Sequence, residues 1–285
     1  MKIKIRSFIE LARLNKPIGI YLLLWPSLLG YILAGINSEL HFTNFLIVLI
    51  GSILVRSCGC VINDISDSKI DRHVKRTMNR PLALGSISII EAWLFFTVLG
   101  ILSIFLLFQT NQLTIKISLF FSILIILYPL TKRFFLAPQF ILLGITFGSG
   151  SIIAYSLESN IFSISIAILY SGIIAWIVSF DTYYALEDKN DDLKIGINST
   201  AILWGGNAIK YSKMLHLFFY FCLLLIAVIN NFSFVFYLVF AVLIYLFFYQ
   251  NKFVKNKKYI KAFKINNAIG FVSFIGFFFE VVYLA

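Results

Sequence analysis

Long apolar stretches alternate with short polar connections along nearly the whole chain. Nine stretches are close to the length of about 20 residues that an α-helix needs to cross a hydrocarbon core. The pattern therefore predicts an all-α, polytopic membrane protein with nine transmembrane helices. Their approximate spans are 18–35, 44–63, 87–108, 113–130, 138–157, 161–186, 214–229, 232–250 and 265–284.

The first 16 residues have a different pattern, typical of a short amphipathic helix that lies in the membrane interface. One side would carry Ile5, Phe8, Ile9 and Ala12, with Lys4, Arg6 and Arg13 elsewhere. We expect this helix to anchor the chain. No linker or low-complexity segment follows, so we expect one domain over 1–285, with the interfacial helix at 1–16 and the bundle at 18–284.

Composition and charge agree with a membrane protein. The chain is 60% hydrophobic, which is too apolar for a soluble globular domain. A net charge of +11 would suggest nucleic acid in a soluble protein, but here the cations gather at the amino terminus and in alternate connections. The positive-inside rule then places the amino terminus in the cytoplasm, in a membrane of the bacterial inner-membrane type. We expect no nucleic-acid partner and no obligate protein partner.

The segment VINDISDSKIDRHVKRTMNRPLAL contains the first concentration of carboxylates. Asn63, Asp67 and Asp71 fall at i, i+4 and i+8, so they share one face if the preceding helix continues through them, and Asp64 lies one turn before Asp67. Hard oxygen ligands of this kind suit Mg²⁺, which takes one or two carboxylates together with substrate phosphates. Cations follow directly, at Arg72, Lys75, Arg76 and Arg80.

A second acidic segment, DTYYALEDKNDD, places Asp181, Asp188 and Asp192 at i, i+7 and i+11, again on one helix face. Both segments end on the predicted cytoplasmic side. The helices that lead into them are four apart in order, which suits two four-helix halves with their carboxylates across a central cavity. The candidate metal ligands are Asn63, Asp64, Asp67, Asp71, Asp181, Asp188 and Asp192.

Arg56 lies inside a predicted span, about two turns before Asp64. A charge at such a depth costs roughly 2.5 to 3.5 kcal/mol on insertion scales, so it should face the bundle interior and a partner. That partner is either an acidic motif or an anionic group of a substrate. The cysteines Cys58, Cys60 and Cys222 also lie inside spans, where packing is the expected role and no disulfide is indicated.

The segments NDISDSKID and HVKRTMNRP, with DTYYALEDKNDDLKIGINSTAILWG, resemble the two signature motifs of the UbiA-type intramembrane prenyltransferases. The resemblance is closest to the 4-hydroxybenzoate polyprenyltransferase branch. It extends to LARLNKPIGIYLLLWP and YPLTKRFFLAPQFILLGITFG, and so touches most of the chain from Leu11 to Gly205. It implies Mg²⁺-dependent transfer of a polyprenyl group from polyprenyl diphosphate to the carbon ortho to the hydroxyl of 4-hydroxybenzoate, in ubiquinone biosynthesis.

The resemblance also implies roles for individual residues. Tyr128 and Lys132, spaced i, i+4, would lie over the diphosphate. The expected diphosphate ligands are Arg72, Arg76, Arg80, Tyr128 and Lys132, and the expected catalytic carboxylates are Asp67, Asp71, Asp188 and Asp192. Arg56 is the candidate for the acceptor's carboxylate, with Arg72 and Arg76 left open as alternatives.

Two alternatives to this function remain at the level of sequence. The first is a related prenyltransferase that acts on another acceptor, such as a naphthoate, haem or chlorophyllide. The second is an ion or phosphate transporter, since carboxylates inside membranes mark ion pathways. Transporter sites lie near the midplane, whereas these acidic motifs lie at helix ends, so the sequence favours the enzyme.

Overall fold

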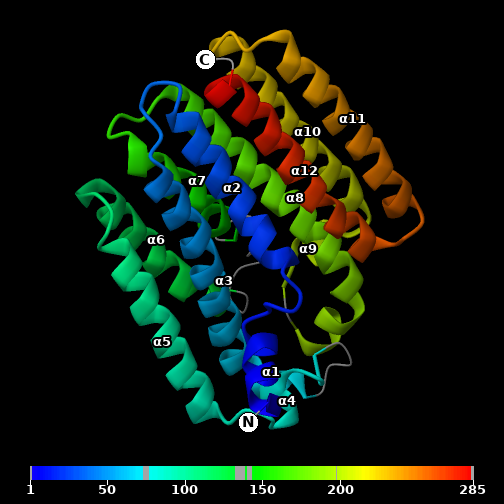
Figure 1. Ribbon diagram of the computed structural model, residues 1–285. Coiled ribbons are helices and arrows are strands. Elements are labelled where there is room, and N and C mark those ends of the chain that lie inside the picture. Colours follow the sequence, from blue (N-terminus) through cyan, green and yellow to red (C-terminus); the bar gives the residue numbers. More distant parts are fainter. Residues whose placement is uncertain (1, 73–76, 132–138, 140–142, 197, 284–285) are drawn as a thin grey trace.

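The computed structural model describes residues 2–72, 77–131, 139, 143–196 and 198–283, and within them all regular secondary structure is helical (Figure 1). The α-helices are α1 (Lys2–Leu11), α2 (Ile18–Ala34), α3 (Phe42–Asp71), α4 (Pro81–Leu84), α5 (Ile89–Leu107), α6 (Gln112–Thr131), α7 (Gly144–Glu158), α8 (Ile164–Ile195), α9 (Thr200–Leu203), α10 (Ala208–Ile229), α11 (Phe234–Lys255) and α12 (Tyr259–Phe278). A 3-10 turn, Gly205–Asn207, precedes α10, and a π-helical turn, η3 (Phe279–Tyr283), follows α12.

Each predicted span overlaps one of these helices. Within the described ranges, six helical stretches are long and apolar enough to cross a membrane, those of α3, α5, α8, α10, α11 and α12, and α2 and α6 are shorter apolar helices. The first helix of the chain, α1, matches the predicted interfacial segment. Helix α10 begins at Ala208, before the span expected from residue 214, because hydropathy marks where the apolar surface begins and not where the helix begins.

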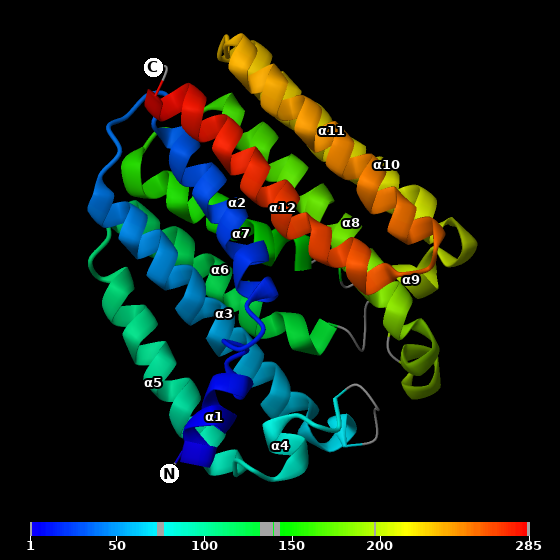
Figure 2. The ribbon, with the colours of Figure 1, turned by 45° about the vertical axis from the view of Figure 1, so that its right-hand side comes forward.

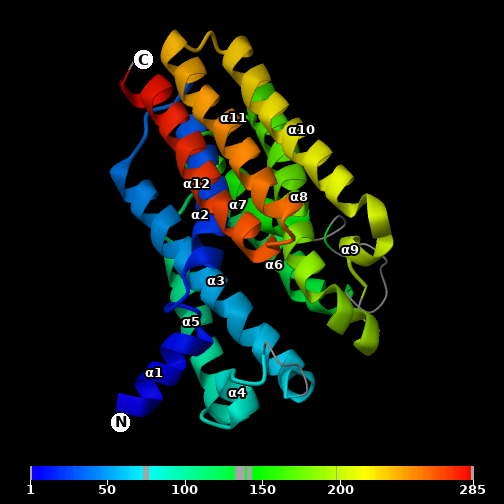
Figure 3. The same ribbon diagram turned by 90° about the vertical axis from the view of Figure 1, so that its right-hand side faces the viewer.

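The continuation of two helices through the acidic segments is confirmed. Helix α3 runs for 30 residues to Asp71, and α8 runs for 32 residues to Ile195. The carboxyl-terminal ends of both helices lie at the same end of the molecule as α1 and the amino terminus (Figures 1 and 3). The carboxyl terminus lies at the opposite end. Both acidic motifs therefore open toward one side of the bundle.

The main core lies where α8 packs against α7, α10 and α12. Trp176 of α8 is fully buried and stacks on Phe219 of α10, with 4.8 Å between ring centroids. Its indole Nε1 donates to Asn266 Oδ1 of α12 at 2.8 Å. The indole thus buries a large apolar surface while its polar atom stays bonded, so three helices are fixed by one side chain.

Small residues bring α2 and α7 into close contact, as Figure 2 shows for the crossing of these two helices. A Cβ atom on Gly30 would lie 2.0 Å from the backbone oxygen of Ser151, and one on Gly150 would lie 2.1 Å from Ser27 Oγ. Close backbone approach of this kind stabilises helix pairs in lipid, where hydrophobic association is weak.

A smaller cluster joins α1 to α3, α4 and α5 through Leu11, Val61, Leu82 and Ala92, which are buried together. Ile5 and Ile9, on another side of α1, are exposed. Exposed apolar side chains beside a docked face are what an interfacial helix requires. Helix α1 is therefore both placed against the bundle and able to contact lipid.

Candidate active site

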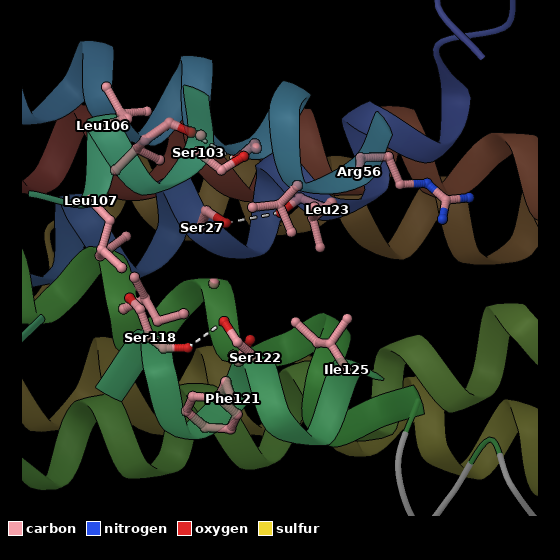
Figure 4. Close-up of a pocket in the computed structure, with 18 of the residues that line it drawn as sticks. Leu23, Ser27, Arg56, Ser103, Leu106, Leu107, Ser118, Phe121, Ser122 and Ile125 are labelled. Carbon is pink, nitrogen blue, oxygen red and sulfur yellow. Dashed lines mark hydrogen bonds between the residues drawn. The ribbon is translucent and has the colours of Figure 1, made fainter. Parts of the chain in front are cut away.

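An apolar cavity of about 380 Å³ lies between α2, α3, α5, α6 and α7. Figure 4 shows labelled lining residues from several of these helices, among them Leu23, Leu107, Phe121 and Ile125. Hydroxyl groups in the lining bond mainly to their own helices, as Ser27 Oγ does to the Leu23 oxygen at 3.0 Å. The cavity thus offers apolar surface and few polar groups to a ligand.

The cavity extends along α3 toward the acidic end of that helix. Val48, Ser52, Arg56 and Asn63 all line the cavity from α3. Asp67 follows Asn63 by four residues on the same continuous helix, so it lies one turn further along nearly the same face. A ligand with an apolar body in the cavity would therefore place a polar head beside Asn63 and Asp67.

Arg56 extends its guanidinium at the cavity, with Cζ 5.2 Å from the centroid of the Phe147 ring. Its Nε is buried and has no hydrogen-bond partner among the described residues. Nor is it ion-paired with either acidic motif there, so the partner that remains from the sequence analysis is a substrate anion. Gly19 makes this position possible, since a Cβ atom at Gly19 would lie 2.7 Å from Arg56 Nε.

Asp64 does not face the cavity, because two arginines hold it. Arg13 Nη2 contacts both carboxylate oxygens of Asp64 at 2.8 Å, and Arg80 Nη1 contacts Asp64 Oδ1 at 3.0 Å. The same Arg80 nitrogen donates to Asp71 Oδ2 at 2.9 Å. The negative charges of Asp64 and Asp71 are thus neutralised by Arg13 and Arg80. Arg13 was expected only in an anchoring helix, and no spacing rule links it to Asp64, 51 residues away.

The second acidic motif stands on α8 with Asp181, Asp188 and Asp192 half-buried on one face, as predicted. Thr182, beside Asp181, lies 2.8 Å from Thr200 between their hydroxyl oxygens. The Thr200 backbone nitrogen donates to Gln139 Oε1 at 3.0 Å. These bonds join α8 at Thr182 to α9, and α9 to the side chain of Gln139. Sequence reasoning missed them, since Thr and Gln give no signal by type alone.

The expected diphosphate ligands are placed only in part. Arg80 is ion-paired with the first motif, and Arg72 is exposed just beyond the end of α3. Arg76 and Lys132 lie outside the described residues, as does the side chain of Tyr128. Cys58, Cys60 and Cys222 are free thiols, in agreement with the expected absence of a disulfide.

The donor chemistry fits Mg²⁺ that arrives together with a diphosphate. In the part of the chain that the structure describes, no group of three or more His, Cys, Asp or Glu side chains is arranged to hold a metal. Mg²⁺ rarely needs such a cage, because it keeps several waters and binds one or two carboxylates plus substrate phosphates. Asn63, Asp67, Asp188 and Asp192 offer only hard oxygen donors for it.

The fold and the site together define a polytopic helical membrane protein whose apolar cavity extends to Asn63 near the acidic end of α3, with the acidic end of α8 on the same side of the molecule. Residues 23–279 match the UbiA prenyltransferase family, and the chain belongs to that family.

Two curated relatives carry the same name. The 4-hydroxybenzoate octaprenyltransferase of Saccharophagus degradans is 38% identical over 279 residues, which cover 97% of this chain and 93% of the relative. The enzyme of that name from Pseudomonas fluorescens is 46% identical over 199 residues, which cover 70% of this chain and 67% of the relative.

Solved structures share the fold. A UbiA homolog from Aeropyrum pernix K1 superposes with a TM-score of 0.80 at 21% identity, covering 90% of this chain and 96% of the homolog. A UbiA homolog from Archaeoglobus fulgidus bound to GPP and Mg²⁺ superposes with a TM-score of 0.67 at 19% identity, covering 94% and 99%.

Proposed function

We propose that this protein transfers a polyprenyl group from polyprenyl diphosphate to 4-hydroxybenzoate, at the ring carbon ortho to the hydroxyl, in ubiquinone biosynthesis. The relatives named for that reaction support the choice of substrates. The structural observation that carries the proposal is the position of Arg56, a half-buried cation that lines the apolar cavity on the same helix as Asn63 and whose Nε has no hydrogen-bond partner among the described residues. A lipid donor and a small anionic acceptor each find their matching surface there.

The donor is held in two parts. Its apolar tail would occupy the cavity, and its diphosphate would lie at the acidic helix ends, where Asn63, Asp67 and Asp71 of α3 and the three aspartates of α8 would hold Mg²⁺. Bound Mg²⁺ neutralises the charge that develops on the departing diphosphate. Arg80, Arg72, Arg76, Tyr128 and Lys132 complete the diphosphate contacts, with Arg80 the strongest candidate because it already lies beside Asp71.

The chain then controls where the new bond forms. The bond between the prenyl carbon and the diphosphate oxygen breaks, and its electron pair leaves with the diphosphate. The allylic cation that remains is protected from water by the apolar lining. Arg56 binds the acceptor's carboxylate as a fork, so the ortho carbon faces the cation and forms the carbon–carbon bond. That carbon then loses its proton, which restores the aromatic ring.

The active site opens toward the cytoplasm of a bacterial-type inner membrane in this proposal. Support comes from the cations, which gather at the end of the bundle where α1 and the acidic ends of α3 and α8 lie. The acceptor, a small water-soluble acid, would enter from that side.

The test is a transfer assay on membranes that contain the protein. They receive labelled 4-hydroxybenzoate, a polyprenyl diphosphate and Mg²⁺, and the lipid products are separated. We expect prenylated 4-hydroxybenzoate, absent without Mg²⁺ and absent from membranes that carry Asp67→Asn. Parallel reactions with a naphthoate, haem or chlorophyllide test the related acceptors, and preferred labelling of one of these would overturn the proposed acceptor.

A further inference from the structure

Arg80 has two roles that compete. The proposed function assigns it to the diphosphate, yet in this structure its Nη1 is engaged by Asp64 at 3.0 Å and by Asp71 at 2.9 Å. Asp64 is only 2% exposed. A buried carboxylate that loses its counter-ion is strongly destabilised. Arg80 can therefore leave Asp64 at low cost only if another cation neutralises the Asp64 carboxylate.

Arg13 has the geometry to be that second cation. It follows the end of α1 with φ of 59°, a left-handed conformation that is uncommon for residues other than glycine. Its Nη1 donates to the Glu10 backbone oxygen at 2.9 Å, while its Nη2 lies 2.8 Å from both Asp64 oxygens. These contacts hold Arg13 in place without any help from Arg80. The backbone conformation aims the side chain at the first acidic motif.

We infer that Arg13 is a positioning residue for Arg80: by neutralising Asp64, it allows Arg80 to move from the carboxylates to the diphosphate. This inference rests on the proposed function. Asp64 is then a fixed anchor instead of a metal ligand, and the interfacial helix α1 becomes part of the active site. Without Arg13, Asp64 would hold Arg80 as its only described counter-ion, and the diphosphate would compete with a buried carboxylate for the same guanidinium.

The first experiment compares Arg13→Gln with Arg6→Gln. Arg6 lies on α1, the helix that directly precedes Arg13, and is ion-paired with Glu10 at 3.1 Å, but it is far more exposed than Arg13, which makes it a matched control. We expect Arg13→Gln to raise the KM for polyprenyl diphosphate about tenfold or more and to leave the KM for 4-hydroxybenzoate unchanged, because charge-assisted bonds to phosphate contribute on this scale. Arg6→Gln should leave both values unchanged.

The second experiment adds Asp64→Asn to Arg13→Gln. The neutral amide no longer needs a counter-ion, so the double variant should recover diphosphate affinity close to that of the wild type. Because it leaves no buried carboxylate at position 64, this variant also serves if Arg13→Gln alone fails to accumulate. Affinity that stays low in the double variant overturns the inference, as does an Arg13→Gln protein that melts at a lower temperature but keeps both KM values.

Binding of polyprenyl diphosphate with Mg²⁺ is also measured without acceptor, by ligand-induced thermal stabilisation. This readout separates the two proposals. If wild-type protein binds the diphosphate but does not prenylate 4-hydroxybenzoate, the proposed acceptor is wrong. The Arg13 variants can still be compared by their affinity for the diphosphate. Equal affinity for polyprenyl diphosphate in wild type and Arg13→Gln would refute the positioning role of Arg13, whatever the acceptor is.

Discussion

Glu280 closes the amino-terminal end of α11 by accepting two hydrogen bonds from Ser233. The Ser233 backbone nitrogen donates to Glu280 Oε2 at 2.7 Å and the Ser233 hydroxyl to Oε1 at 2.7 Å, and the Phe236 backbone nitrogen adds a third bond at 3.0 Å. Free backbone N–H groups at a helix start favour a negative charge. A carboxylate in η3, the turn that directly follows α12, thus fixes the start of α11 to the end of α12.

Glu280→Ala should lower the stability of the protein by about 1 to 3 kcal/mol, because the partly buried backbone N–H and hydroxyl of Ser233 lose their acceptor. Melting curves in detergent would show the loss, while turnover per folded molecule should stay near the wild-type value. Glu39→Ala, on an exposed loop at the same end, is the control and should melt normally. Equal melting temperatures for the two variants would contradict the capping role.

Asp67→Asn and Asp188→Asn should each abolish turnover while leaving membrane insertion intact, since each removes a charge from the proposed Mg²⁺ site at nearly constant volume. EDTA should have the same effect on the wild type. Asp191→Asn is the matched control, because Asp191 is half-exposed and pairs with Lys194 at 3.6 Å on the same helix. Near-normal rates in Asp67→Asn or Asp188→Asn with Mg²⁺ present would refute the metal assignment.

Arg80→Ala and Arg56→Ala should affect different substrates. Loss of the Arg80 fork should weaken polyprenyl diphosphate by about 1.5 to 3 kcal/mol, which is roughly ten- to hundredfold in affinity, with little effect on 4-hydroxybenzoate. Arg56→Ala should instead weaken the binding of 4-hydroxybenzoate, with little effect on polyprenyl diphosphate. Apparent affinities of both substrates on both variants decide the matter, and an unchanged diphosphate affinity in Arg80→Ala would remove Arg80 from the site.

Cysteine labelling with a membrane-impermeant reagent tests the orientation. Cysteines introduced at Asn37 and Asn231 should react from outside, and those at Lys194 and Lys257 should not, as the distribution of cations requires. The native thiols are partly or fully buried within helices, so their background should be low. Reaction in the reverse pattern would invert the topology.

His41 gives the stability a dependence on pH. The hydrogen bond between His41 Nδ1 and Glu158 Oε2, 2.8 Å long, and the negative charge of Glu158 raise the pKa of His41 above its usual 6.5. Since the folded-state pKa is the higher one, the ion pair stabilises the fold fully below about pH 6.5, and the contribution is lost as pH rises through the folded-state pKa.

The melting temperatures of wild type and His41→Gln should therefore differ most at mildly acidic pH and converge in alkaline buffer. The difference should be small, because the imidazole is largely exposed and its charge is screened by solvent. A gap that widens toward alkaline pH would contradict the assigned charge state.

The helices and their polar faces were predictable because both depend on spacing within one element. Asn63 and Asp67 share a face of α3 by periodicity alone, and the same holds for Asp188 and Asp192 on α8. The apolar spans followed from length and hydropathy, since the bilayer fixes both. These features need no knowledge of how helices pack.

The contacts between elements were not predictable. The pairing of Arg13 with Asp64 depends on the left-handed backbone at Arg13 and on the docking of α1 against α3. The space for Arg56 depends on the close approach of Gly19. Crossing angles and loop paths determine such contacts, and one sequence without a structure does not specify them.

The lengths of α3 and α8 determine where the two substrates meet. At 1.5 Å per residue, helices of 30 and 32 residues extend about 45 to 48 Å, whereas the hydrocarbon core is about 30 Å thick. A tilt of about 20° shortens this reach only slightly. In the proposed orientation, a surplus of about 15 Å at the carboxyl-terminal ends would carry the carboxylates out to the depth of the lipid headgroups. A donor that never dissolves in water and an acceptor that never dissolves in lipid can therefore react at the boundary between their two solvents.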